Sequence, residues 1–178
     1  MLEFLSLQPR TFGLDLSDLS LKICQLQRER GFLRLVSFGE FPLKSGVIEQ
    51  GEVKNEQELV KTLKEAVKKV RGNPLRTKYV AVSLPEEKAF LQIIQLPRMK
   101  PEEIRKAVTF EAENYIPYSM DTVYGDFQVI EPFHDHVDHL DVLIASLPRV
   151  TVDSYVSALK KAGLIPKVLE IESFATAR

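Results

Sequence analysis

The sequence has little of what marks several classes of protein. Cys24 is its one cysteine, so no internal disulfide can form and a reducing compartment is expected. The net charge is −1, and no global field favours nucleic acid or an anionic membrane. No apolar run approaches the roughly 20 residues needed to span a bilayer. The N-terminus also lacks the basic start and long apolar centre of a signal peptide. A cytoplasmic protein with no direct membrane insertion and no nucleic-acid partner is therefore expected.

What is present fits a folded α/β protein. The chain has 178 residues, 44% of them hydrophobic and 28% charged, which allows one domain or two small subdomains. Period-two alternation and continuous apolar runs predict strands over 12–16, 19–28, 32–41, 79–84, 89–96, 122–130, 140–146 and 167–171. Period-3.6 stripes predict helices over 55–71, 101–116 and 150–162.

Local signals sharpen these predictions. Asn55 and Glu58 form a capping-box pattern, Pro101 suits the first turn of a helix, and Gly163 suits a helix C-terminus. In strand 19–28 we expect Cys24 to be a small buried hydrophobe. In strand 32–41 we expect Leu33, Leu35 and Ser37 to share one face. The stripe of the second helix is predicted to contain these residues: Ile104, Ala107, Val108, Glu111, Ala112 and Tyr115.

One segment is unusual enough to indicate a family. Residues 110–123 read FEAENYIPYSMDTV, the end of an amphipathic helix stopped by Pro117. They resemble the pattern WEAE-x-YIPFP-[LI]-DEV of PilM, the actin-like family of type IV pilus assembly, which is related to the division protein FtsA. The resemblance covers residues 11–178 almost entirely and about half of a complete PilM.

The resemblance implies a fold and its division. We expect a truncated actin-like (ribonuclease H-like) subdomain, residues 1–84 plus 165–178, with an inserted strand-helix-strand-strand subdomain over residues 85–164. The final strand should then lie beside strand 79–84. The predicted order of elements agrees with this arrangement.

Residues 13–22, GLDLSDLSLK, resemble the first phosphate loop of actin-like ATPases. The resemblance implies that Asp15 lies near Mg²⁺, that backbone N–H groups of residues 17–20 face the phosphates, and that Lys22 adds positive charge. The cofactor-binding residues implied are Asp15, Ser17, Asp18, Ser20 and Lys22. The family has glycine where Ser17 stands, and the second half of such a site lies beyond IESFATAR, residues 171–178. We therefore expect no enzyme activity and no cofactor in this chain, although a full-length parent would bind ATP and Mg. A plain hairpin whose polar residues face water remains the alternative.

The resemblance also implies a partner. PilM relatives bind the cytoplasmic N-terminal peptide of the inner-membrane protein PilN, in a groove between the two subdomains expected here. The candidate partner-binding residues are Glu111, Tyr115, Ile116, Pro117 and Tyr118. The function implied is a cytoplasmic scaffold of fimbrium biogenesis and twitching motility, held at the inner membrane through PilN-like and other pilus assembly proteins. A second copy of the chain, in a homo-oligomer, is a further candidate partner. The alternative functions are a fragment of an actin-like ATPase whose full-length parent binds ATP, and a GspL- or FtsA-type scaffold of secretion or division machinery.

Two further clusters have ordinary explanations. His134, His136 and His139 could bind Zn²⁺ or Ni²⁺, but a solvated hairpin tip is favoured and no metal is predicted. The carboxylates near residue 115 suit an interaction surface or an ion pair better than catalysis, because no nucleophile accompanies them: Glu111, Glu113, Asp121 and Asp126. No catalytic residue is predicted.

Overall fold

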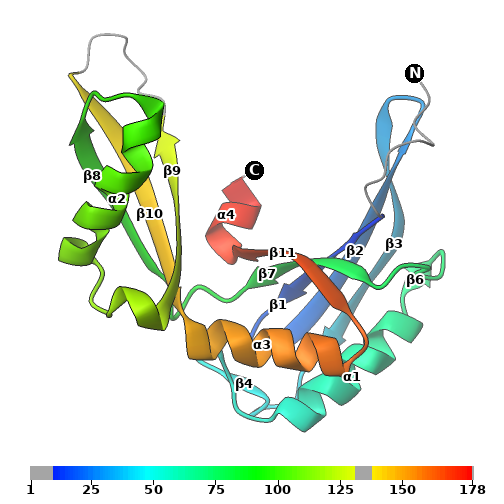
Figure 1. Ribbon diagram of the computed structural model, residues 1–178. Helices are drawn as coiled ribbons and strands as arrows, with labels where there is room; N and C mark the ends of the chain where they lie inside the picture. The colour runs from blue at the N-terminus through cyan, green and yellow to red at the C-terminus, as the bar shows by residue number, and fades with distance from the viewer. Residues whose placement is uncertain (1–9, 131–137, 178) are drawn as a thin grey trace. The chain divides into compact units, whose positions relative to one another are not determined.

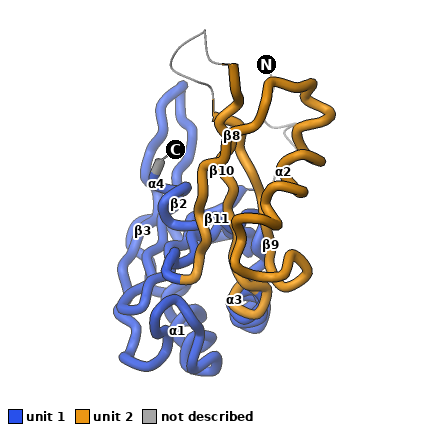
Figure 2. The backbone as a smooth tube through the Cα atoms, turned by 90° about the vertical axis from the view of Figure 1, so that its left-hand side faces the viewer, with its two compact units in different colours: residues 1–87, 153–178 blue, residues 88–152 orange. Residues whose placement is uncertain are grey.

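The computed structural model describes residues 10–130 and 138–177, which form two compact units. One unit is residues 1–87 with 153–178, and the other is residues 88–152 (Figure 2). The chain therefore returns to the first unit at residue 153, whereas the sequence prediction placed this return at residue 165. The difference is residues 153–164, which include most of helix α3 (Arg149–Lys161). In this part of the helix Tyr155 and Leu159 are buried, and Lys161 pairs with Glu56 at 2.5 Å.

A six-stranded mixed sheet organises the first unit. The strand order is β11 (Ile165–Ile171), β7 (Tyr79–Leu84), β1 (Phe12–Leu16), β2 (Ser20–Glu29), β3 (Phe32–Pro42) and β6 (Arg71–Gly72). β1, β2 and β3 form the predicted antiparallel meander, while β7 pairs in parallel with both β1 and β11. The prediction that the final strand lies beside residues 79–84 is confirmed.

Helices lie on both faces of this sheet. Figure 1 shows α1 (Glu56–Lys68) and α3 along one face. The side chains of Phe12, Leu14 and Leu16 are buried in alternation along β1. Half of the predicted capping box is confirmed, because the Asn55 side chain accepts a hydrogen bond from the Glu58 N–H at 3.0 Å. The other half is not formed: the Asn55 N–H donates to the Val47 carbonyl, and the Glu58 carboxylate pairs with Lys44. The short α4 (Glu172–Ala177) lies over the opposite face (Figure 1). α4, β6 and the small hairpin of β4 (Ile48–Glu49) and β5 (Glu52–Val53) were not predicted.

Two predictions about β2 and β3 are wrong. Cys24 is exposed, because Leu21 and Ile23 occupy the buried phase of the β2 alternation. Ser37 is buried on the face opposite Leu35, because the register shifts and leaves Val36 without a directly opposed residue. A β-bulge of this kind reverses the side-chain alternation that a strict period of two assumes.

The second unit has the predicted strand-helix-strand-strand order. An antiparallel sheet of β8 (Phe90–Pro97), β10 (His139–Pro148) and β9 (Val123–Ile130) is covered on one face by α2 (Pro101–Tyr115). A 3₁₀ turn, η2 (Met120–Thr122), joins helix and sheet. The core of this unit consists of Ile94, Leu96, Val108, Ala112, Ile116, Val142 and Ile144.

Candidate functional site

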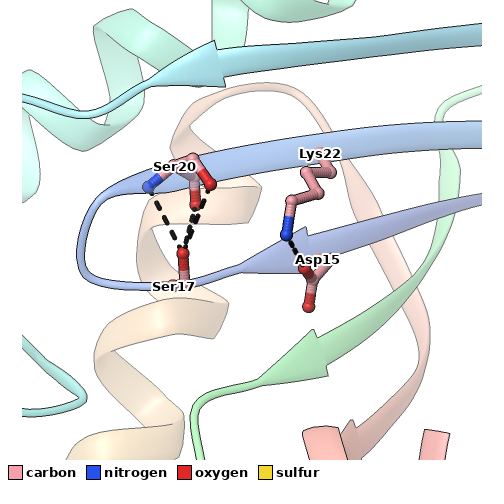
Figure 3. A network of polar contacts seen from close by, with 4 residues as sticks. All are labelled: Asp15, Ser17, Ser20 and Lys22. Carbon is pink, nitrogen blue, oxygen red and sulfur yellow. Dashed lines mark hydrogen bonds and ion pairs between the residues drawn. The ribbon is translucent and has the colours of Figure 1, made fainter. Parts of the chain in front are cut away.

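The predicted phosphate loop is the turn between β1 and β2. The Ser17 N–H donates to the Ser20 carbonyl at 3.0 Å, and the Ser17 hydroxyl donates to the same oxygen at 3.1 Å. The Ser20 N–H in turn donates to the Ser17 hydroxyl oxygen at 3.3 Å (Figure 3). The turn is therefore closed by its own two serines.

Serine fits the position that glycine holds in the family loop. Among the described residues other than glycine, only Arg30 and Gln50 have a positive φ, so Ser17 needs no left-handed backbone. Its N–H group and that of Ser20 are, however, already used inside the turn. Within the described chain no hydrogen bond uses the N–H groups of Asp18 and Leu19, which remain as donors for an anion.

Asp15 and Lys22 lie directly opposite each other on β1 and β2, and Figure 3 shows their side chains meeting. Lys22 Nζ lies 3.3 Å from Asp15 Oδ2, and both side chains reach solvent. Beside this pair is a hollow of about 280 Å³, on the sheet face that α4 partly covers. Its lining is Gly13, Leu14, Asp15, Lys22, Cys24, Ala81, Val82, Ser83, Val168, Glu170 and Ala175.

Carboxylates dominate the charge near this hollow. Burial raises the pKa of Glu172, and the neighbouring carboxylates of Asp15, Glu86 and Glu87 raise it further, against an opposing effect of Lys22. An approaching polyphosphate would meet the same carboxylates. These carboxylates would repel a phosphate group that arrived without a divalent cation.

Asp18 does not line this hollow. Its carboxylate instead stabilises the neighbouring turn at Gln50 and Gly51. Its two oxygens accept the N–H groups of Gln50 at 2.7 Å and Gly51 at 3.1 Å. Gln50 and Gly51 have φ of 50° and 73°, a left-handed pair that closes the β4–β5 hairpin. The buried Tyr155 hydroxyl donates to the Gly51 carbonyl at 3.0 Å. Sequence reasoning missed this clamp; the Gln-Gly dipeptide was the available signal for the turn.

The predicted partner-binding segment is an ordered turn after α2. The Ile116 N–H donates to the Ala112 carbonyl at 2.9 Å, and the Ile116 side chain is buried in the core of the second unit. Tyr115 and Tyr118 are 47% and 46% exposed on either side of it. The prediction that Tyr115 belongs to the inner stripe is therefore wrong: the chain leaves the helix at that point, and Ile116 takes the buried place.

The remaining members of this segment have local roles. Glu111 is half-buried and accepts a hydrogen bond from the Asn114 amide at 3.4 Å, while Pro117 is exposed. Ser119 donates a short hydrogen bond to Asp121, and this bond lowers the pKa of the Asp121 carboxyl. The Thr122 N–H and hydroxyl both donate to the Ser119 carbonyl, at 2.8 and 2.7 Å. The segment thus presents two tyrosines from a hydrogen-bonded turn anchored in the core by Ile116.

The histidine cluster lies largely outside the described residues, as His134 and His136 fall there. His139 begins β10, with Nε2 3.1 Å from the Gln95 amide nitrogen and 3.5 Å from Asp141. In residues 10–130 and 138–177 no group of three potential ligands could hold a metal ion. Among the helices that the structure describes, none is long and apolar enough to cross a membrane.

The sheet order, the hairpin with its Asp15–Lys22 pair and the small second unit define the first part of an actin-like α/β protein. The family model of the type IV pilus assembly protein PilM matches residues 13–178. The chain belongs to that family.

Two solved structures support this fold. A structure described as the PilM–PilN type IV pilus biogenesis complex matches with a TM-score of 0.80 and 29% identity, covering 94% of this chain and 49% of that one. The cytoplasmic domain of EpsL, an inner-membrane component of the type II secretion system of Vibrio cholerae, matches with a TM-score of 0.54 and 15% identity. That match covers 90% of this chain and 56% of EpsL, and it concerns the fold alone. The chain thus spans about half the length of both.

Proposed function

We propose that this chain is the partner-binding part of a cytoplasmic type IV pilus assembly scaffold. Its partner would be the cytoplasmic N-terminal peptide of a PilN-like inner-membrane protein. The observation that carries the proposal is the similarity to a chain of the structure described as a PilM–PilN complex, at 29% identity over 94% of this chain. Through that peptide the scaffold would be held at the inner membrane without entering it.

The turn after α2 is the surface that best suits such contacts. Tyr115 and Tyr118 together present two half-exposed aromatic side chains, each with an apolar ring and a hydroxyl. Aromatic side chains of this kind carry much of the binding free energy in many interfaces. Buried Ile116 fixes the backbone between them, so little backbone conformational entropy would be lost on binding.

Calorimetry with the PilN N-terminal peptide tests this proposal. A short peptide has a small interface, so a Kd in the micromolar range, about −8 kcal/mol, is expected. Tyr115→Ala and Tyr118→Ala should each weaken binding by roughly tenfold, or about 1.4 kcal/mol. Phe110→Ala is the matched control, since Phe110 is 70% exposed on the same helix but lies outside the turn. Absence of heat with folded protein at high peptide concentration would end the proposal.

A second candidate concerns nucleotide. We infer that the β1–β2 turn would be one wall of an ATP–Mg site in a longer parent, with the N–H groups of Asp18 and Leu19 and the Lys22 ammonium toward phosphate. Asp15 would hold the cation through water, as Mg²⁺ retains much of its hydration shell. The free N–H donors, and the hollow beside Asp15 and Lys22, support this assignment.

This chain by itself should not hydrolyse ATP, because one wall cannot enclose the transferred phosphate. Purified protein assayed with ATP and Mg²⁺ should give no phosphate release above that of an Asp15→Ala variant. Turnover that persists through purification and is lost in the variant would contradict this expectation.

A further inference from the structure

Strands β2 and β3 continue past the end of β1 as a two-stranded arm, residues 25–36. β1 pairs with β2 over Leu21–Cys24, whereas β2 and β3 remain paired as far as Glu29 and Phe32 (Figure 1). Arg30 and Gly31 close the arm with φ of 50° and 89°. No described strand pairs with the outer edges of this arm. Both of its faces carry exposed side chains, Leu26 and Leu33 on one and Phe32 and Arg34 on the other.

Four large apolar side chains lie exposed on one face of the arm and its base. We call this set the leucine stripe: Leu26, Leu33, Leu35 and Phe38, which are 51%, 70%, 49% and 44% exposed. Leu26 is directly opposite Leu35, and directly opposed residues of antiparallel strands share a face. Leu33 lies opposite Arg28, and Phe38 lies opposite Cys24. Cys24 and Arg28 are each two residues from Leu26 in β2, so their side chains lie on the same face as that of Leu26.

The bulge at Val36 creates this stripe. Without it, strict alternation along β3 would place Leu33 and Leu35 on the face opposite Phe38. The shift in register between Gln25 and Leu26 brings all of them to one face. The other face of the arm is more polar, with an ion pair of Arg34 and Glu29 at 3.0 Å, although Phe32 is also exposed there.

The two ends of the stripe carry opposite charges. Beyond Leu26 toward the tip lies Arg28, and beyond Phe38 toward the base lies Glu40, both exposed and on the same face. Lys22, opposite Glu40, is already paired with Asp15 at 3.3 Å. From tip to base the face therefore begins with Arg28 beside Leu33, continues through the remaining apolar residues, and ends with Glu40 beside the Lys22–Asp15 pair.

Such a surface is complementary to itself when turned end for end. A two-fold axis at its middle would place Arg28 of one copy against Glu40 of the other, twice, with the apolar residues between them. We propose that the leucine stripe docks against the same stripe of a second copy of this chain, forming a symmetric dimer. This interface goes beyond the proposed function and does not depend on it.

Sedimentation of the 178-residue protein over a wide concentration range tests the proposal. Standard interfaces bury about 800 Å² per partner, and the stripe offers four side chains, so association should be weak and visible at high concentration. Leu33→Asp should weaken the dimer at least tenfold, by about 1.4 kcal/mol. Phe32→Asp is the matched control, because Phe32 is 79% exposed next to Leu33 but lies on the other face, and it should leave association unchanged.

Charge exchange separates this interface from any other apolar contact. Arg28→Glu and Glu40→Arg should each weaken the dimer, and the double variant should restore it. Far-ultraviolet circular dichroism would confirm that every variant is folded, which the exposure of all four positions favours. A protein that is monomeric at every concentration would overturn the proposal. So would a dimer that Phe32→Asp weakens as much as Leu33→Asp, or one that the double variant fails to restore.

Discussion

Single residues in the hairpin between β1 and β2 serve two different purposes. Asp15 and Lys22 face solvent beside a hollow, as a ligand-binding role requires. Asp18 lies three residues further on, and both of its carboxylate oxygens accept hydrogen bonds from backbone N–H groups of the Gln50–Gly51 turn. The hydroxyl of Tyr155 completes that clamp from α3 by bonding the Gly51 carbonyl. A motif read from sequence alone treats these aspartates alike, and only their hydrogen-bond partners separate them.

Tyr155→Phe tests the clamp. The variant removes one hydrogen bond and leaves the carbonyl of buried Gly51 without this donor. The free energy of unfolding at neutral pH should therefore be about 1 kcal/mol lower than that of the wild type. Urea denaturation measures the difference. Tyr115→Phe, at a half-exposed tyrosine, is the control and should change the unfolding free energy little.

The pH dependence of the same variant follows from linkage. Burial raises the pKa of Tyr155, and the carboxylates of Asp18, Glu87 and Glu52 raise it further. An unfolded tyrosine ionises near pH 10, so above that pH the unfolded chain releases a proton that the folded chain keeps. Stability should therefore fall as pH rises above 10, and the gap between wild type and Tyr155→Phe should narrow there. A gap that stays constant across pH 10 would contradict the assignment.

At the scale of elements, the middle of β3 has a close backbone approach. β6 is two residues long, and its Gly72 pairs with Ser37 at φ of 86°. A Cβ at Gly72 would lie 2.3 Å from the Val36 carbonyl oxygen, which also accepts the Asn73 N–H at 2.8 Å. The bulge at Val36 and this glycine therefore form one structural device, and the leucine stripe depends on it.

Gly72→Ala should destabilise the protein through both strain and collision. Gly163, after α3, supplies the control, because its φ is also 86° but no atom lies within 4 Å of a Cβ there. Gly163→Ala should cost about 1 kcal/mol for the left-handed backbone alone, and Gly72→Ala should cost at least twice that. Thermal or urea unfolding of the two variants measures the difference. Equal losses would show that the Val36 backbone moves aside freely.

Elements were predictable from sequence where local chemistry decides them. Asn55 caps α1, Pro101 begins α2, and Gly163 follows α3 with a left-handed φ, as the local patterns indicated. The β-bulge at Val36 was not predictable, since it arises from pairing between strands and leaves no turn residue in the sequence. The same holds for the clamp on the Gln50–Gly51 turn, whose partners are distant in the chain.

The candidate sites were predictable in part, for the same reason. The resemblance located the β1–β2 turn and the segment after α2, because both are contiguous in sequence. It did not distinguish exposed Tyr115 from buried Ile116, since one residue at a helix end decides which side chain enters the core. Nor did it indicate that two of the N–H groups in the β1–β2 turn are used by Ser17 and Ser20 themselves.

For the whole molecule, the two units differ in how the chain builds them. The first is assembled from two separate segments, residues 1–87 and 153–178, and β11 from the second segment pairs with β7 from the first. The second is one continuous segment, residues 88–152, with its own sheet, helix and core. A continuous segment with a complete core can fold without the rest of the chain, whereas β7 lacks its β11 neighbour until the end of the chain is present.

Residues 88–152 expressed alone should therefore fold, with modest stability. A segment of this size buries only about 60% of the surface of its unfolded chain, and a core so small supplies roughly 3–5 kcal/mol. Circular dichroism should show helix and strand, with a cooperative thermal transition. Ile116→Ala should lower its midpoint clearly, because a buried aliphatic side chain lost from a core costs about 2–5 kcal/mol, while Tyr118→Ala should change it little. A fragment without a cooperative transition would mean that this unit draws its stability from the other, and the two would then have to be treated as one folding unit.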